Sequence, residues 1–269
     1  MNNEKPLILL VNDDGILSPG LAALCEAVSK FGELLIVAPD RQQTSMGRSY
    51  PRHDNLGVVE EVEIITKKGE FKGYSVNSSP AYAVAYAVKE ISTKKPDLCI
   101  SGINYGENLG KTLSYSGTIG AALQAADFDI PTLAISRPTE LDIINNRDYA
   151  PLNWDIAKKV ISFWTDKVLK EGIPFKAPII NINVPENPEN LYDYKYTNQS
   201  KKELFEFIKP KERVMNKPYK LPSLKRTNFD DIEKGSDIYS VCVENITSVT
   251  PIEGDFTFKS FLKEKNIFC

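Results

Sequence analysis

The sequence predicts an α/β protein built around a mostly parallel β-sheet. Two short apolar runs, at residues 7–12 and 34–38, flank a segment whose apolar residues have helical spacing. A strand, a helix and a second strand in this order place the two strands parallel in one sheet. Apolar strands predicted at 98–100, 132–135 and 179–184 repeat the pattern, so most of the chain is expected to build a single sheet.

Helices are predicted between these strands. The first has Pro19 near its start and ends at Gly32. The second spans 79–91, with Ser79 as its N-cap and Pro80 at its first position, where a missing N–H costs nothing. Two more helices are expected over 117–126 and 153–169.

The chain changes character between residues 191 and 236. Lysines, tyrosines and prolines are interleaved there, and neither a core helix nor a clear strand pattern is evident. We therefore expect an extended arm, followed by strand-like alternation at 238–250. The predicted organisation is a main α/β domain (1–190), the arm (191–236), and a C-terminal strand and tail (237–269).

Composition limits the classes of partner. The 269 residues are 42% hydrophobic and 26% charged, an ordinary globular balance. A net charge of −3 argues against binding a nucleic-acid duplex through bulk charge. No apolar run approaches the roughly 20 residues that span a bilayer, and the first residues lack a signal-peptide pattern. We expect a cytoplasmic protein with no membrane partner.

Three loops rich in oxygen-bearing side chains and glycine follow the predicted strands. They comprise residues 12–15, 39–45 and 101–110. In an open α/β sheet, the ligand site forms at the carboxyl ends of the parallel strands. The three loops are therefore expected to meet at one site.

The adjacent carboxylates Asp13 and Asp14 point to a cation in that site. Neighbouring carboxylates raise each other's pKa unless a cation lies between them, and oxygen ligands suit Mg²⁺ or Mn²⁺. The only histidine is His53 and no cysteine pair has CxxC spacing, which excludes a histidine-based zinc site or a Ser-His-Asp triad. Taken alone, the two aspartates could equally be a helix-capping pair.

A second motif, Tyr-Ser-Gly-Thr-Ile-Gly at 115–120, leads into the helix predicted at 117–126. Backbone N–H groups at a helix N-terminus bind anions, and hydroxyl groups add donors. An ordinary Ser/Thr N-cap is the alternative. Beside a cation cluster at the same sheet edge, phosphate binding is the favoured interpretation.

These motifs, taken in order, resemble the SurE family of 5′-nucleotidases. The resemblance rests on Asn-Asp-Asp-Gly, Ala-Pro-Asp-Arg, Ser-Gly-Ile-Asn-x-Gly-x-Asn-Leu-Gly and Tyr-Ser-Gly-Thr. It continues through residues 181–185 and 248–251, and so covers nearly the whole chain. Because several motifs occur in the same order, the similarity is far more specific than a single Asn-Asp-Asp-Gly.

The resemblance implies a Rossmann-like three-layer fold and hydrolysis of nucleoside 5′-monophosphates, with 3′-nucleotides left open as substrates. It also implies a homodimer or homotetramer that exchanges C-terminal elements, which suits the predicted arm. One divalent metal ion, Mg²⁺ or Mn²⁺, would be held in each subunit by Asp13, Asp14, Thr44 and Asn104.

Two positions depart from the family pattern. Thr44 stands where serine is usual, which keeps the hydroxyl group. The usual Gly-Thr-Pro-x-Asp-Cys stretch is Ser-Ser-Pro-Ala-Tyr-Ala here, so Tyr82 and Ala83 replace an aspartate and a cysteine. We expect this second change to affect the choice of substrate more than the chemistry.

The expected chemistry is hydrolysis of a phosphomonoester. Asp13 or Asp14 would orient the attacking water and accept its proton. A phospho-aspartate intermediate is the alternative, and the sequence does not decide between them. The phosphate oxygens would be held by Asn108, Ser116, Gly117 and Thr118.

Other classes of protein fit the motifs less well. A response-regulator receiver needs a phosphoacceptor aspartate after a central strand, where this chain has Ser-Gly-Ile-Asn. A dinucleotide-dependent oxidoreductase needs GxGxxG after the first strand, and NDDGILSPG is not that. A non-catalytic nucleotide-binding stress protein of the same fold remains the alternative, because the changed stretch at 78–83 could mark lost activity.

Overall fold

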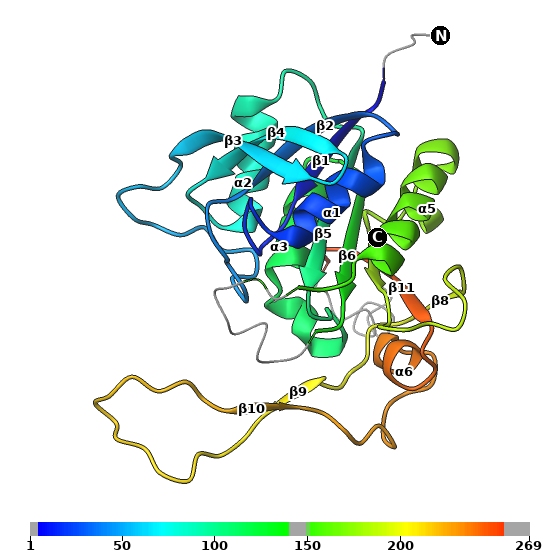
Figure 1. Ribbon diagram of the computed structural model, residues 1–269. Helices are drawn as coiled ribbons and strands as arrows, with labels where there is room; N and C mark the ends of the chain where they lie inside the picture. Colours follow the sequence, from blue (N-terminus) through cyan, green and yellow to red (C-terminus); the bar gives the residue numbers. More distant parts are fainter. Residues whose placement is uncertain (1–4, 140–148, 150, 256–269) are drawn as a thin grey trace, which may run out of the picture.

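The computed structural model describes residues 5–139, 149 and 151–255, and within them it confirms the α/β fold. A nine-stranded sheet runs in the order β3-β4-β2-β1-β5-β6-β7-β11-β8 (Figure 1). The strands predicted from apolar runs form its parallel centre. These are β1 (Leu7–Val11), β2 (Glu33–Pro39), β5 (Leu98–Tyr105), β6 (Thr132–Arg137) and β7 (Ile179–Asn183).

Helices cover both faces of the sheet, which gives three layers (Figure 1). Alternate residues of β1 face opposite cores: Ile8 packs with the α1 and α5 side, and Leu9 packs with the α2 and α3 side. All four predicted helices are confirmed, although the second ends as a π-helical turn, η1 (Ala87–Ile91). Their bounds are α1 (Pro19–Val28), α2 (Pro80–Tyr86), α3 (Gly117–Ala126) and α5 (Asp155–Glu171).

One edge of the sheet is a hairpin that the apolar pattern did not predict. It consists of β3 (Val59–Thr66) and β4 (Gly69–Val76), and β4 pairs in parallel with β2. Most β3 side chains are exposed, including three glutamates. An edge strand of this kind lacks the continuous apolar run that marked the central strands.

The other edge corrects the prediction for 238–250. Residues 238–242 lie in a helix, α6 (Asp237–Cys242), capped by the Ser236 hydroxyl, and the strand β11 (Thr247–Ile252) comes after it. β11 runs antiparallel to β7 and pairs with β8 (Tyr194–Tyr196). β8 belongs to the main sheet although it lies within the segment predicted as an arm.

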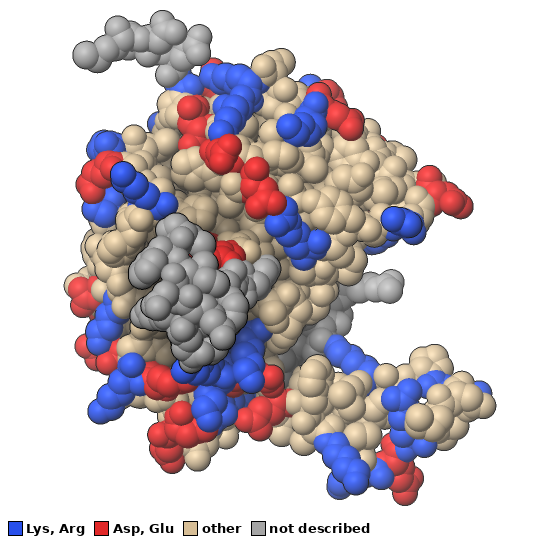
Figure 2. Space-filling model, turned by 180° about the vertical axis from the view of Figure 1, so that it is seen from behind, with Lys and Arg blue, Asp and Glu red and all other residues tan. Residues whose placement is uncertain are grey.

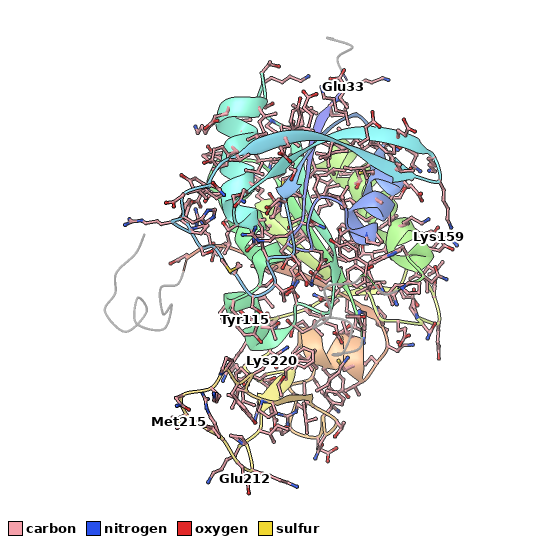
Figure 3. The ribbon with its side chains drawn as sticks, turned by 60° about the vertical axis from the view of Figure 1, so that its left-hand side comes forward. Glu33, Tyr115, Lys159, Glu212, Met215 and Lys220 are labelled. Carbon is pink, nitrogen blue, oxygen red and sulfur yellow. The ribbon has the colours of Figure 1, made fainter. Side chains whose placement is uncertain are left out.

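A two-stranded hairpin, β9 (Phe205–Phe207) and β10 (Ser223–Lys225), extends away from the sheet (Figure 1). Glu212 and Met215 lie at its far end (Figure 3), and Figure 2 shows Lys and Arg side chains gathered on it. Because β8 belongs to the main sheet, we use the name arm from here on for residues 199–236 only, the later part of the segment predicted as an arm.

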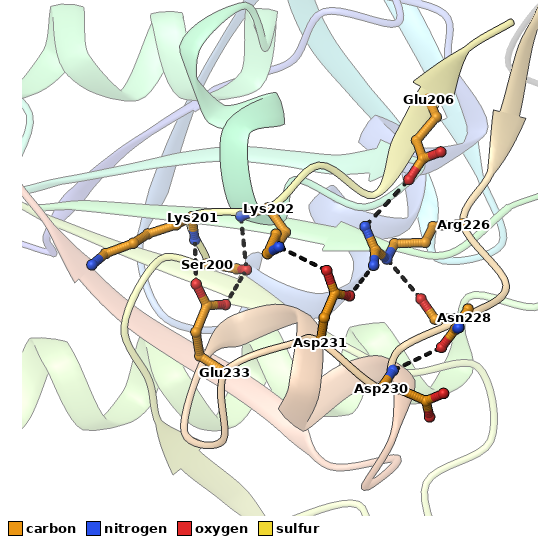
Figure 4. A network of polar contacts seen from close by, with 9 residues as sticks. All are labelled: Ser200, Lys201, Lys202, Glu206, Arg226, Asn228, Asp230, Asp231 and Glu233. Atoms are coloured by element: carbon orange, nitrogen blue, oxygen red, sulfur yellow. Dashed lines mark hydrogen bonds and ion pairs between the residues drawn. The ribbon is translucent and has the colours of Figure 1, made fainter.

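The base of the arm is fastened by polar contacts (Figure 4). Asp231 accepts from Lys202 and from Arg226, and Glu233 accepts from the Ser200 hydroxyl.

Short 3₁₀ helices occur at η2 (Gly110–Ser114) and η3 (Pro174–Lys176). In the described ranges, no helix combines the length and the apolar character needed to cross a bilayer.

Candidate active site

The candidate site lies where the sheet changes direction. From β1 the chain crosses to β2 on one side, and the later strand β5 pairs with β1 on the other side. In open α/β sheets, ligands bind at such a point, outside the carboxyl ends of the strands, here those of β1 and β5. Asp13 and Asp14 directly follow β1, and Asn104 lies near the end of β5. The topology thus brings three of the four predicted metal ligands to one edge.

Asp13 lies against the N-terminus of α3. Its side chain is buried, and its Oδ1 accepts a hydrogen bond of 2.7 Å from the Thr118 hydroxyl. Gly117 is equally close: a Cβ atom built there would come within 2.7 Å of Asp13 Oδ2. Only glycine leaves room for the carboxylate at this position.

Asp14 is held by other residues. The Tyr105 N–H donates to Asp14 Oδ2 over 3.2 Å, and the Tyr149 hydroxyl donates to the Asp14 carbonyl oxygen over 2.6 Å. The rings of Tyr105 and Tyr149 are stacked with centroids 6.1 Å apart. These contacts fix the backbone of the second aspartate.

The surroundings of Asp13 and Asp14 disfavour the charged form of both carboxylates. Burial raises the pKa of Asp13 to about 6. Burial, and then the charge of Asp13, raise the pKa of Asp14 well above its usual value. Among the residues described, no Lys or Arg forms an ion pair with either aspartate. A hard divalent cation fits this all-oxygen set, because it supplies the charge that the surrounding side chains do not.

The other two predicted metal ligands lie in different settings. Asn104 is buried, and its side-chain N–H donates to the Gly106 carbonyl, so its amide oxygen is the atom suited to a cation. Thr44 is exposed in the loop after β2. That loop is tied to the site because the Gln43 N–H donates to the Asp13 carbonyl over 2.6 Å.

The predicted phosphate-binding side chains are mostly engaged in the protein itself. Ser116 caps α3 by accepting from the Ile119 N–H, as the simple N-cap interpretation expects, and the Thr118 hydroxyl donates to Asp13. The Asn108 side chain donates to the Ser136 hydroxyl over 2.8 Å. The Thr118 N–H also donates to the Asp13 carboxylate. The Gly117 N–H at the start of α3 is therefore better suited to phosphate than these side chains.

Two asparagines that the sequence analysis did not assign support Asn108. Asn183 accepts from its N–H over 2.8 Å, and the amides of Asn181 and Asn183 both donate to its carbonyl oxygen. Both lie on β7, which is distant from the loop after β5 in the sequence and reaches it only in the folded chain. Their place in the stretch 181–185 was the only signal in the sequence.

Fold and site together define a class of protein. A mostly parallel sheet, covered on both faces, carries two buried adjacent aspartates at its switch point, and Asp13 lies against a helix N-terminus. Such an arrangement is typical of α/β enzymes that act on phosphorylated small molecules.

Comparison with known proteins gives the particular family. Residues 8–206 match the family model described as "Survival protein SurE". The chain is 35% identical over 266 residues to the 5′-nucleotidase SurE of Christiangramia forsetii, covering 98% of this chain and 97% of the relative. It is 32% identical to the 5′-nucleotidase SurE of Methanosphaera stadtmanae, covering 92% and 94%.

The crystal structure of the SurE protein from Aquifex aeolicus has the same fold. It superposes with a TM-score of 0.76 at 31% identity, covering 96% of this chain and 98% of that one. The chain therefore belongs to the SurE family, as the ordered motifs predicted.

Proposed function

We propose that the protein is a divalent-metal-dependent phosphomonoesterase that converts nucleoside 5′-monophosphates to nucleoside and phosphate. The observation that carries the proposal is the buried pair Asp13 and Asp14 at the switch point of the sheet, with Asp13 set against the N-terminus of α3. Relatives that match over nearly the whole chain are named 5′-nucleotidases. 3′-Nucleotides are a second substrate class to be tested.

The residues suited to hold one Mg²⁺ or Mn²⁺ ion per subunit are Asp13, Asp14, Thr44 and Asn104. When bound, the ion supplies positive charge to the phosphate and lowers the pKa of a water molecule. The oxygen-only donor set and the raised pKa values of the two aspartates support this assignment.

In the proposed mechanism, one aspartate orients the attacking water and accepts its proton. Thr118 donates to Asp13 Oδ1, which fixes the direction of that carboxylate. Both the N–H and the hydroxyl of Thr118 serve Asp13, so the Gly117 N–H and the cap residue Ser116 bind the phosphate oxygens at the start of α3 and stabilise their charge. Asn108 contributes from the facing loop. Direct attack by an aspartate is the alternative mechanism.

Phosphate release from a panel of 5′- and 3′-nucleotides tests the proposal. We expect activity with added Mg²⁺ or Mn²⁺, loss of activity in EDTA, and recovery when metal is restored. Asp14→Asn should abolish activity. Equal activity after exhaustive chelation would contradict the mechanism. Nucleotide binding without phosphate release would instead support the non-catalytic alternative.

The arm supports a proposal about subunits. Within it, Phe207, Val214 and Met215 are largely exposed, more apolar surface than a monomer normally leaves in water. We therefore propose that the arm packs against a second copy of the chain, in a homodimer or homotetramer. Light scattering at micromolar concentration should give a multiple of the 30.1 kDa chain mass. A strictly monomeric mass would rule this out.

A further inference from the structure

A buried glutamate lies inside the loop that carries the candidate site residues. Glu107 follows Asn104 by three positions and directly precedes Asn108. Its side chain is 0% exposed, and its Oε1 forms an ion pair with Lys225 Nζ. Its other carboxylate oxygen, Oε2, is buried and has no hydrogen-bond partner among the described residues. In the part of the chain that the structure describes, Lys225 is the basic side chain that pairs with Glu107.

That lysine comes from the arm. Lys225 is the last residue of β10, 118 positions further along the chain, and its side chain is 38% exposed. A buried carboxylate whose only cation is removed is strongly unfavourable, because no water replaces the lost partner. The loop that carries Glu107 is therefore expected to move if Lys225 is withdrawn.

Further contacts join the same loop to the base of the arm. Asp237 Oδ2 accepts from the Gly110 N–H over 2.9 Å, and the Gln199 side chain donates to the Gly110 carbonyl over 2.8 Å. Leu109 packs in one apolar cluster with Leu204 of the arm and Ile238 of α6. The arm base and the site loop thus form one packed unit.

We infer that Lys225 is a positioning residue: through Glu107 it holds the loop that carries the candidate metal ligand Asn104 and the candidate phosphate-binding residue Asn108. The expected change in KM rests on the proposed function. The expected movement of the loop rests only on the ion pair between Lys225 and Glu107. Lys225 thus gives the arm a part in substrate binding that is separate from its part in assembly.

Kinetics at saturating Mg²⁺ test the consequence. Lys225→Met should raise KM for the nucleotide about tenfold and change kcat by less than about threefold, because a displaced loop weakens substrate binding. Lys225→Arg, which keeps the charge, should behave as wild type. Lys217→Met removes the same charge from an exposed position of the same arm and should change neither constant.

The double variant Glu107→Gln with Lys225→Met separates positioning from general damage. It removes the buried charge together with its partner, so KM should return to within about threefold of wild type. An unchanged KM in Lys225→Met, or a double variant worse than both single variants, would overturn the inference.

Hydrogen–deuterium exchange of residues 104–113 gives a measurement that needs no activity. Exchange there should be faster in Lys225→Met than in wild type and Lys217→Met, and should slow again in the double variant. Equal exchange in all variants would contradict the inference. A wild type that releases no phosphate would refute the proposed function alone, since the exchange pattern still decides whether Lys225 holds the loop.

Discussion

Replacing Gly117 by alanine tests the contact between α3 and the candidate metal site. Gly117 is the first residue of α3, and a Cβ atom there would lie 2.7 Å from both Cβ and Oδ2 of Asp13. Real Cβ atoms essentially never approach other atoms closer than 3.0 Å, and ordinary contacts begin at 3.4 Å. Either Asp13 or the start of α3 must therefore move by at least about 0.3 Å, and by about 0.7 Å to restore an ordinary van der Waals contact.

A movement of this size is expected to change catalysis and metal binding more than the stability of the fold. Alanine favours a helix over glycine by about 1 kcal/mol, whereas crowding a packed site costs about 1–3 kcal/mol. The net change in the free energy of unfolding should therefore be small. A misplacement of about 1 Å at a reacting group, by contrast, can cost about a hundredfold in rate. We expect Gly117→Ala to lower kcat by ten- to a hundredfold and to weaken Mn²⁺ binding.

Titration calorimetry with Mn²⁺, phosphate release and thermal unfolding measure the three quantities. The control is Gly254→Ala, whose added Cβ would lie 3.5 Å from Leu123 Cδ2, an ordinary contact. This control should match wild type in all three measurements. If Gly117→Ala keeps wild-type Mn²⁺ affinity and kcat, the packing of α3 against Asp13 does not control the site and the reasoning fails.

Three further predictions concern metal and substrate. Thr44→Ala should weaken Mn²⁺ binding and activity severely, Ser45→Ala only mildly, and Thr44→Ser should remain active; the opposite ranking in calorimetry would place the metal ligand one residue later. Restoring the family pair by Tyr82→Asp with Ala83→Cys should shift the ratio of rates among nucleotides, and an unchanged ratio would mean that the segment is structural. Mg²⁺ at a hundred times its Kd should stabilise the fold by about 2.7 kcal/mol, raising Tm by about 5–10 °C, and Asp14→Asn should abolish this shift in differential scanning fluorimetry.

The central sheet and its helices could be predicted because local signals and burial agree there. The helix predicted at 117–126 is α3 with the same bounds, since Ser116 caps it and its small residues pack against the sheet. α6 was missed because it is only six residues long. Ile238 and Val241 are buried in it against the arm base, and such tertiary packing decides the structure of short segments.

The site was predictable to the extent that topology alone decides it. The strand order places Asp13, Asp14 and Asn104 at one edge of the sheet, independently of the contacts of their side chains. The direction of the Asn108 side chain was not predictable, because its partner Ser136 lies 28 residues away on another strand. Similarly, nothing in the spacing of the sequence connects Glu107 with the arm.

The capping of α1 bears on how the Asp13 and Asp14 pair is interpreted. A capping pair would accept from the first N–H groups of α1, yet Ser18 caps that helix by accepting from the Leu21 N–H over 3.2 Å. Glu107, buried in the neighbouring loop, has a lysine to balance its charge. The two aspartates, equally buried, have no ion pair with a basic side chain in the described ranges. This contrast with Glu107 is the reason for proposing a cation, and not a capping role, at the two adjacent aspartates.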